Sequence, residues 1–299
     1  VKIVFEINNL ILDWNSPQLR NKISDWIFED IGNGDLTQSS ITENIGKACW
    51  IAKEDGIFCG IELLKIIFNQ IDKEINFYPL IKDGQKFKKN DILLELIGPS
   101  RSLLASERIS LNIAMHLSGV STHTYKIVEK LRNTGIKLAD TRKTTPGLRS
   151  LEKYAFKCGG GINHRMGLYD AAMIKENHIA WSKNIKNAIE RIRLNTPFTT
   201  HIIVEAENIG QAKEAILAGA DSILLDELKP SILRENINLL REVRLNNDCK
   251  EERKNLIIEV SGINPDEIEN YLIDGIDLIS TSSATTKSKW IDFSMRYID

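Results

Sequence analysis

Hydrophobic and polar positions follow two different patterns in the two halves of the chain. In residues 47–97, short apolar runs are interrupted by turn signals at Asp55-Gly56, Gly60 and Asp83-Gly84. Between them, "GIELLKIIFNQI" carries apolar residues at helical spacing. Residues 100–135 have helical periodicity that ends at Gly135, and Gly119 is predicted to divide them into two helices. The first half therefore predicts an α+β segment followed by long helices.

After Gly135 the chain repeats one unit, in which an apolar strand ends in a charged or hydroxyl residue and a helical pattern follows. Two helical stretches are plain: "NIGQAKEAILAGA", and "NPDEIENYLIDG" with Asn264 as its expected cap. Alternating strands and helices predict parallel pairing with right-handed crossovers, and continuous apolar strands predict burial on both faces. Six such units indicate an incomplete βα-barrel, with a doubly wound open sheet as the alternative. The six strand runs are "IKLAD", "AAMIKEN", "HIIVEAEN", "SILLDE", "NLIIEVSG" and "DLISTSS".

The carboxyl ends of these strands carry the candidate chemistry, because a barrel gathers its functional groups at that end. Cations, carboxylates and hydroxyls all recur at the carboxyl end of the strand in each unit. They are Asp140 to Lys143, Lys175 with Glu176, Glu205 with Glu207, Asp226 with Glu227, Glu259 with Ser261, and Ser280 to Ser283.

Composition limits the function classes. The chain has 299 residues, 42% of them hydrophobic and 27% charged, with a formal net charge of -2, which argues against a broad basic face for nucleic acid. Without 18 uninterrupted apolar residues, no membrane-spanning helix and no membrane partner are expected. The scattered cysteines predict neither a disulfide framework nor a zinc site and fit a reducing, cytoplasmic location; they are Cys49, Cys59, Cys158 and Cys249.

Five basic residues lie beside turns or at a strand end, and they suit a substrate with more than one anionic group. Arginine offers a planar fork to carboxylate or phosphate, while lysine offers a mobile point charge. The glycines of "TTPGL" and "CGGGINHR" mark a backbone that bends tightly or approaches a ligand. The alternative is a set of ordinary solvated cations. The residues are Arg142, Lys143, His164, Arg165 and Lys175.

Two carboxylates, Glu205 and Asp226, end successive strands and could hold Mg²⁺ together with waters and substrate phosphates. The competing interpretations are a general acid/base pair without metal and simple charge balance against the lysines. The hydroxyl-rich ends "VSGIN" and "STSSATTKS" suit phosphate, unless they are capped surface loops. His116 and His123 fall within the long helical stretch and are assigned to packing or to the surface.

The block "ADTRKTTPGLRSLEKYAFKCGGGINHRMGLYDAAMIKENHI" closely resembles the signature of the quinolinate phosphoribosyltransferase family, also called nicotinate-nucleotide pyrophosphorylase (carboxylating). The resemblance extends to "EDIGNGDLT", "ASERISLNIAMHLSGVST", "VEAEN", "ILLDE", "IEVSGI" and "IDFSMRY". It covers the chain from about residue 29 to its end.

The resemblance implies an N-terminal α/β sandwich domain over residues 1–123 and an incomplete α/β barrel over 124–286, with a strand in 287–299 returning to the first domain. It also implies a homodimer that transfers phosphoribose from phosphoribosyl pyrophosphate to quinolinate with Mg²⁺ and releases CO₂. In the family's site pattern, Arg142, His164 and Arg165 would bind quinolinate, and the catalytic residues would be Lys143, Lys175, Glu205 and Asp226. Glu205 and Asp226 would also bind the ribose and Mg²⁺, and the phosphates would lie near Ser261, Gly262, Ser280 and Ser282. Arg108 would be supplied by the partner subunit.

Two departures fall on the expected phosphate loop: one glycine fewer after Ser261, and Ser282 where the family has glycine. A third, "LDE" in place of "LDN", adds a negative charge beside Asp226. Three alternatives stay open. These are a binding homologue that is catalytically weakened, a molybdenum-associated paralogue of the same fold, and an aldolase that uses Lys175 as a Schiff base.

Overall fold

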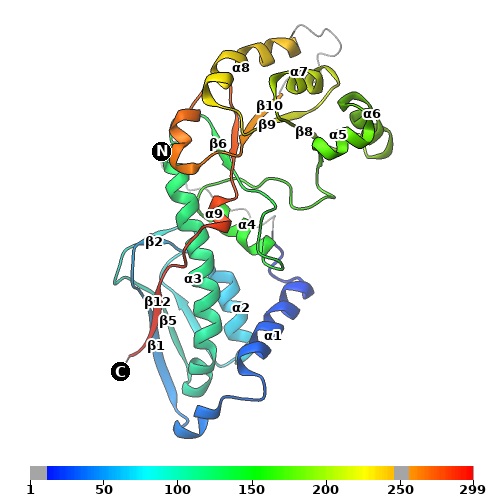
Figure 1. Cartoon of the computed structure of the whole chain (residues 1–299). Coiled ribbons are helices and arrows are strands. Elements are labelled where there is room, and N and C mark those ends of the chain that lie inside the picture. The colour runs from blue at the N-terminus through cyan, green and yellow to red at the C-terminus, as the bar shows by residue number, and fades with distance from the viewer. Residues whose placement is uncertain (1–11, 246–255, 299) are drawn as a thin grey trace. The chain divides into compact units, whose positions relative to one another are not determined.

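The computed structural model of this chain describes residues 12–245 and 256–298 (Figure 1). They form two compact units. Unit 1 takes in the chain up to Tyr125, Thr145–Gly160 and the segment from Ala284, whereas unit 2 takes in Lys126–Thr144 and Gly161–Ser283. Among the described residues, no helix has the length and the apolar character that crossing a bilayer requires.

Unit 1 is built on a four-stranded antiparallel sheet in the order β12-β1-β5-β3. Its strands are β1 (Ile45–Ala52), β3 (Asn76–Pro79), β5 (Ile92–Pro99) and β12 (Phe293–Ile298), and β2 (Gly56–Ile57) pairs with β4 (Lys86–Phe87) in a second small sheet. The helical segments are α1 (Pro17–Ile31), η1 (Leu36–Ser40), α2 (Ile61–Ile71), α3 (Ser100–Lys130), α4 (Arg149–Cys158) and α9 (Ser283–Thr286), with the boundaries between units falling inside α3 and α9.

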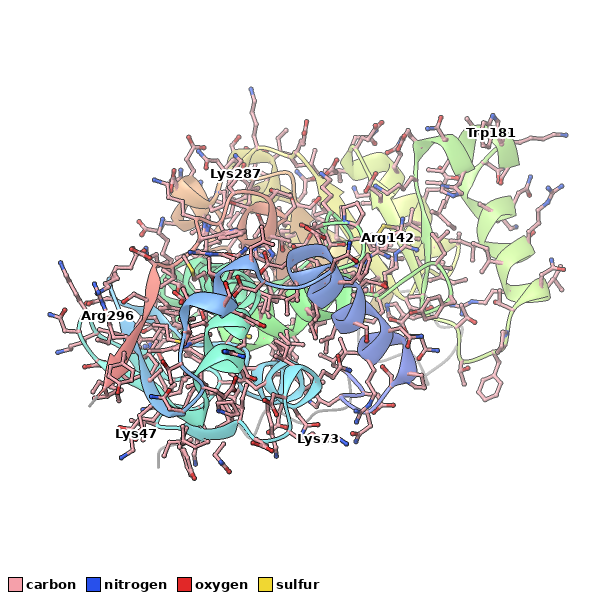
Figure 2. All side chains as sticks on the ribbon, turned by 90° about the horizontal axis from the view of Figure 1, so that it is seen from below. Lys47, Lys73, Arg142, Trp181, Lys287 and Arg296 are labelled. Atoms are coloured by element: carbon pink, nitrogen blue, oxygen red, sulfur yellow. The ribbon has the colours of Figure 1, made fainter. Side chains whose placement is uncertain are left out.

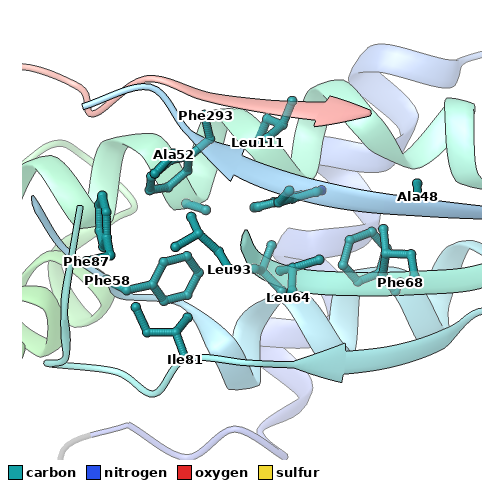
Figure 3. Packing of buried hydrophobic residues seen from close by; sticks show 14 of the residues in the cluster. Ala48, Ala52, Phe58, Leu64, Phe68, Ile81, Phe87, Leu93, Leu111 and Phe293 are labelled. Carbon is teal, nitrogen blue, oxygen red and sulfur yellow. The ribbon is translucent and has the colours of Figure 1, made fainter. Parts of the chain in front are cut away.

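The core of unit 1 contains a group of aromatic rings from segments that are far apart in the sequence (Figure 3). Phe58 stacks on Phe293 with 5.8 Å between ring centroids, and Phe87 meets Phe293 edge-on at 5.5 Å. Trp50 on β1 is fully buried beside them, in register with Met295 of β12. Burial of such rings contributes about 1.5–3 kcal/mol each, so β12 is part of this core rather than a loose tail.

The helix α3 runs unbroken through Gly119, so the prediction that this glycine divides the stretch into two helices is wrong. The reason is a close approach. A Cβ at position 119 would collide with the carbonyl group of Lys289, in the segment that leads to β12. Glycine is therefore placed here to admit a neighbouring backbone, and the flanking residues Leu117 and Val120 remain buried in the helix.

The Thr145–Gly160 segment belongs to unit 1, although the expected division placed it within the barrel. Its helix α4 buries Leu151, Tyr154 and Ala155 in the same core as Leu117 of α3. Ser121 on α3 donates a hydrogen bond to the Ala155 carbonyl at 2.8 Å. Apolar burial along one face of α4 therefore attaches this segment to α3, whatever its place in the sequence.

Unit 2 is a six-stranded parallel sheet in the order β6-β11-β10-β9-β8-β7. From β7 to β11 every step is to the next strand in the chain, and the first strand, β6, then pairs with the last, β11. A doubly wound sheet reverses its direction at a switch point, which this order lacks, so that alternative is wrong and the barrel prediction is confirmed. The described residues show no pairing between the edge strands β6 and β7, as expected of an incomplete barrel. The strands are β6 (Lys137–Ala139), β7 (Ala172–Ile174), β8 (Ile202–Ala206), β9 (Ser222–Asp226), β10 (Ile257–Ser261) and β11 (Leu278–Ser280).

The connections of unit 2 are α5 (Glu176–Ser182), α6 (Ile185–Asn195), α7 (Ile209–Leu217), α8 (Pro230–Leu245) and η2 (Pro265–Tyr271). The last is a 3-10 helix where the sequence predicts an α-helix, although the Asn264 side chain caps it as expected by accepting from the Asp266 N–H. On α5, Trp181 is 85% exposed and projects from the ribbon (Figure 2).

Candidate active site

A pocket of about 400 Å³ opens in unit 2 where the parallel strands end. It is lined by eleven of the twelve side chains or backbones that the sequence nominates, from turns and strand ends that lie up to 140 residues apart. The twelfth, Arg108 on α3, lines instead a cavity of about 540 Å³ in unit 1. The eleven are Arg142, Lys143, His164, Arg165, Lys175, Glu205, Asp226, Ser261, Gly262, Ser280 and Ser282.

Parallel register explains why the acidic and hydroxyl groups meet. Asp226 is paired in register with Ser261 on the neighbouring strand, and the Ser261 hydroxyl donates to Asp226 Oδ1. Because parallel strands that are in register end at the same edge of the sheet, the last residue of each strand lies at the same end of the barrel. Strand ends thus collect polar groups, while the apolar positions before them, such as Leu225 and Val260, stay buried.

The contact between Lys175 and Glu205 is the tightest ion pair in this pocket. Lys175 Nζ lies 2.5 Å from Glu205 Oε2, with the lysine side chain 43% exposed and the glutamate 12% exposed. Lys175 directly precedes α5, and Glu205 stands one residue before the end of β8. The pairing orients a mobile lysine in the pocket and leaves the second carboxylate oxygen of Glu205 available for another ligand.

The cations of the "DTRKTT" turn are presented by a tight local backbone. Lys143 N–H is bonded to the Thr141 hydroxyl at 3.0 Å, and Thr144 N–H donates to the Arg142 carbonyl at 3.0 Å. Lys143 is exposed and Arg142 half-buried, and Figure 2 shows Arg142 labelled among the projecting side chains. A short turn therefore places two neighbouring cations on one pocket.

The second pair of neighbours, His164 and Arg165, is fixed by hydrogen bonds that the two residues donate to nearby acceptors. Asp140, only 1% exposed, accepts the His164 backbone N–H at 2.9 Å, and Arg165 Nη1 donates to the Ala171 carbonyl at 3.0 Å. Burial and the charge of Arg142 both lower the pKa of Arg165, while Glu205 opposes them. Two guanidinium groups close enough to affect each other suit a ligand with two negative groups.

The loop after β10 is shaped for a close backbone approach. Gly262 has a φ of 74°, and a Cβ at that position would collide with the Glu227 side chain. Glu227 itself has a φ of 54°, which is uncommon for a residue other than glycine or asparagine. This strained residue is the one at which the chain departs from the family's "LDN".

Glu205 and Asp226 are the carboxylates that could hold a cation, and both line the pocket. The described residues contain no group of three or more His, Cys, Asp and Glu side chains placed to bind a metal ion. Mg²⁺ needs only one or two carboxylates when waters and substrate phosphates complete its shell, so the donor set fits this ion. The three described cysteines are buried and form no disulfide, and Cys249 lies outside the described residues.

Sequence reasoning noted Glu259 at a strand end but gave it no role. It lines the same pocket, yet its side chain is almost fully buried, with Oε2 at 3.4 Å from His164 Nε2. A carboxylate inside the apolar run "LIIEV" was the available signal, because a buried acid in a strand requires a partner.

A parallel barrel with a cationic pocket at its strand ends, joined to an antiparallel α/β unit, defines an enzyme that handles anionic substrates. The chain belongs to the quinolinate phosphoribosyltransferase family. The family's C-terminal domain matches residues 120–296, and its N-terminal domain matches residues 35–118.

Relatives and solved structures agree with this assignment. The probable nicotinate-nucleotide pyrophosphorylase [carboxylating] of Bacillus subtilis is 40% identical over 283 residues, covering 94% of each chain. The one from Synechocystis is 36% identical and covers 92% of this chain and 91% of its own. The crystal structure of NadC from Streptococcus pyogenes superposes with a TM-score of 0.86 at 36% identity, covering 94% of this chain and 98% of that one.

Proposed function

We propose that this protein transfers phosphoribose from phosphoribosyl pyrophosphate to the ring nitrogen of quinolinate. Loss of CO₂ then gives nicotinate mononucleotide, a step in NAD biosynthesis. Membership of the family and the names of its relatives support this activity. The observation that carries it is the single pocket that combines paired arginines, lysines, two carboxylates and a hydroxyl-rich loop.

Quinolinate recognition is assigned to the basic side of the pocket. Quinolinate carries two carboxylates, and Arg142 and Arg165 offer planar forks that can bind them with two hydrogen bonds each. His164 adds a third group beside them, and Lys143 and Lys175 face both substrates. The site is completed by Arg108 of the partner subunit in a homodimer, an assignment that rests on the family pattern.

The ribose and the metal are assigned to the acidic side. Glu205 and Asp226 would accept hydrogen bonds from the ribose hydroxyls and would hold Mg²⁺. When bound, Mg²⁺ neutralises the pyrophosphate that leaves. The two carboxylates also lie where positive charge develops on the ribose, because bond cleavage at C1 gives the sugar oxocarbenium character.

The phosphate groups are assigned to the loops after β10 and β11. The backbone at Gly262 and the hydroxyls of Ser261, Ser280 and Ser282 supply uncharged donors there, and late loops of βα-barrels commonly bind phosphate. Since Ser261 already donates to Asp226, its role is also to orient that carboxylate.

Decarboxylation leaves an electron pair on a ring carbon of the nucleotide. Positive charge held beside that carbon lowers the energy of the intermediate, and Lys143 and Lys175 are the mobile cations available in the pocket. The ion pair with Glu205 keeps the Lys175 ammonium directed into the site. The cytoplasmic location inferred from the cysteines stays a prediction.

A spectrophotometric assay with quinolinate, phosphoribosyl pyrophosphate and Mg²⁺ tests the proposal, with nicotinate mononucleotide and CO₂ as products. We expect product formation that is lost without Mg²⁺ and in Arg142→Ala, and that is retained in the matched control Arg191→Ala, an exposed arginine on α6.

The other outcomes separate the alternatives. Quinolinate binding by calorimetry without product would indicate a binding homologue. Covalent trapping of Lys175 by borohydride with a carbonyl substrate would indicate an aldolase. Neither product nor quinolinate binding would point to the molybdenum-associated paralogue and overturn the proposal.

A further inference from the structure

Glu259 is a buried carboxylate for which the proposed reaction has no assigned use. It is 2% exposed, and its register partners are Leu224 on β9 and Leu278 on β11. Burying a charged group among apolar neighbours is costly unless it is paired. Because its burial is costly, we expect this carboxylate to have a structural or functional role.

The polar group that faces Glu259 is the imidazole of His164. Glu259 Oε2 lies 3.4 Å from His164 Nε2, and the histidine side chain is 11% exposed. Oε1 has no hydrogen-bond partner within residues 12–245 and 256–298. The separation is longer than a normal hydrogen bond, which is common for catalytic contacts before the substrate is bound.

The other ring nitrogen of His164 defines where its proton resides. Nδ1 accepts the backbone N–H of Arg165 at 2.7 Å, so this nitrogen presents a lone pair. A ring with an acceptor at Nδ1 carries its proton on Nε2, the nitrogen directed at Glu259. The Nε2–H of this tautomer is therefore directed at an acceptor, the Glu259 carboxylate.

The same contacts fix Arg165. Its backbone N–H is held by the His164 ring, its guanidinium by the Ala171 carbonyl, and the preceding peptide by Asp140. Rotation of the His164 ring would release the Arg165 backbone and shift a guanidinium that lines the pocket. The orientation of one imidazole thus decides the position of a substrate-binding cation.

We propose that Glu259 is a positioning residue, which holds His164 as the Nε2–H tautomer and thereby fixes Arg165 in the anion pocket. Glu259 acts through His164 and does not bind substrate itself. The consequence for quinolinate affinity rests on the proposed function, whereas the tautomer is a property of the free protein.

The tautomer is tested by nitrogen NMR of protein labelled with ¹⁵N-histidine. The chain has five histidines, so His164 can be assigned from the signal that His164→Asn removes. We expect protonated Nε2 and unprotonated Nδ1 in wild type and in Glu259→Gln, which keeps an acceptor oxygen. Glu259→Leu removes the acceptor at Nε2, which lets the ring rotate away from the Arg165 N–H, and should therefore show a mixture of tautomers.

Affinity is tested in parallel with the two substrates. Glu259→Leu should raise KM for quinolinate by about tenfold or more, since it leaves a buried N–H without its acceptor, while KM for phosphoribosyl pyrophosphate is retained. Glu259→Gln should recover most of that loss. The control is Glu214→Gln, an exposed glutamate on α7 that the candidate site does not include.

Two results overturn the proposal. One is a ring proton on Nδ1 of His164 in wild type, which decides the question even if Glu259→Leu does not fold. The other is a tautomer and a quinolinate KM that are unchanged in folded Glu259→Leu. An inactive wild type with the expected tautomer would instead count against the proposed function alone.

Discussion

Each unit contains a histidine paired with a buried glutamate, and the two pairs differ in how completely they are satisfied. In unit 1, His116 Nε2 lies 2.9 Å from Glu152 Oε1, and Oε2 of the same carboxylate accepts the Thr145 N–H at 2.9 Å. Burial raises the pKa of Glu152, but the hydrogen bonds from His116 and Thr145 outweigh it and leave the pKa below its ordinary value. Each oxygen of this carboxylate therefore has a hydrogen-bond partner.

The pair in unit 2 is looser. His164 and Glu259 are 3.4 Å apart, and the second carboxylate oxygen has no partner among the described residues. The pair in unit 1 joins α3 to α4 and, through Thr145, to the turn before α4, so it is a clamp for the fold, although His116 also lines the cavity that contains Arg108. The pair in unit 2 lies at a pocket, where incomplete contacts leave room for adjustment when substrate binds. A pair of the same two residue types thus stabilises the fold of one unit and positions a side chain of the pocket in the other.

The largest effect is expected where the pocket is altered without the fold. Lys175→Ala should lower kcat by about 100-fold to 1,000-fold, because it removes a cation placed where negative charge develops. Steady-state kinetics measure the loss, and urea unfolding should show a stability close to wild type. Lys186→Ala, at a lysine whose side chain is 69% exposed on α6, is the matched control. Equal turnover in both variants would remove Lys175 from the reaction.

Glu152→Ala should break the clamp in unit 1 and lower the free energy of unfolding by about 2–4 kcal/mol. It leaves the Thr145 N–H and the His116 ring without their acceptor and opens a void in a packed interior. Urea denaturation provides the measurement, with Glu74→Ala, an exposed glutamate before β3, as the control. A loss no greater than that of the control would contradict the distinction between the two pairs.

Acid should expose the same clamp. The folded-state pKa of Glu152 is lowered, so its contribution to stability is complete above the ordinary value of 4.5 and is lost as the pH falls through the folded-state pKa. The difference in unfolding free energy between wild type and Glu152→Gln should therefore shrink between about pH 5 and about pH 3. A constant difference over this range would mean that the charge of Glu152 is not what stabilises the turn.

The smallest effect on stability is expected from the looser pair. Glu259→Gln should change the free energy of unfolding by less than about 1 kcal/mol, since among the described residues the only polar contact of the wild-type carboxylate is the long one to His164. Chemical denaturation beside Glu152→Gln gives a direct comparison of the same substitution in the two units. A larger loss at position 259 would reverse the comparison.

The sequence predicts unit 2 better than unit 1, for a physical reason. Each βα unit repeats one pattern. Parallel register brings Glu205, Asp226 and Ser261, which lie at or next to the ends of their strands, to one end of the sheet. The position of a residue within the repeat therefore predicts whether it reaches the pocket. Unit 1 depends on contacts between distant segments. Whether Gly119 breaks a helix cannot be decided locally, because its reason is the carbonyl of Lys289.

Within the pocket, residue types were predictable and their connections were not. The cations and carboxylates follow from motif and strand phase, whereas the hydrogen bond from the Arg165 backbone to the His164 ring depends on side-chain rotation. Likewise, the sequence assigns His116 to packing or the surface because it falls within a long helical stretch, and its partner Glu152, 36 positions away, could not be predicted from it. The contribution of Arg108 from a partner subunit stays a prediction.

The antiparallel pairing of β1 with β12 has a consequence for how the protein is made. Lys47 meets Ile298 and Ala52 meets Phe293, so the first strand of the sheet pairs with a strand that is synthesised after the whole barrel. Throughout synthesis of the barrel, the N–H and C=O groups on one edge of β1 are unpaired, and such edges recruit other strands. Termination of translation between β11 and β12 would release a chain with all its barrel strands and an open sheet edge, which favours proteolysis and aggregation.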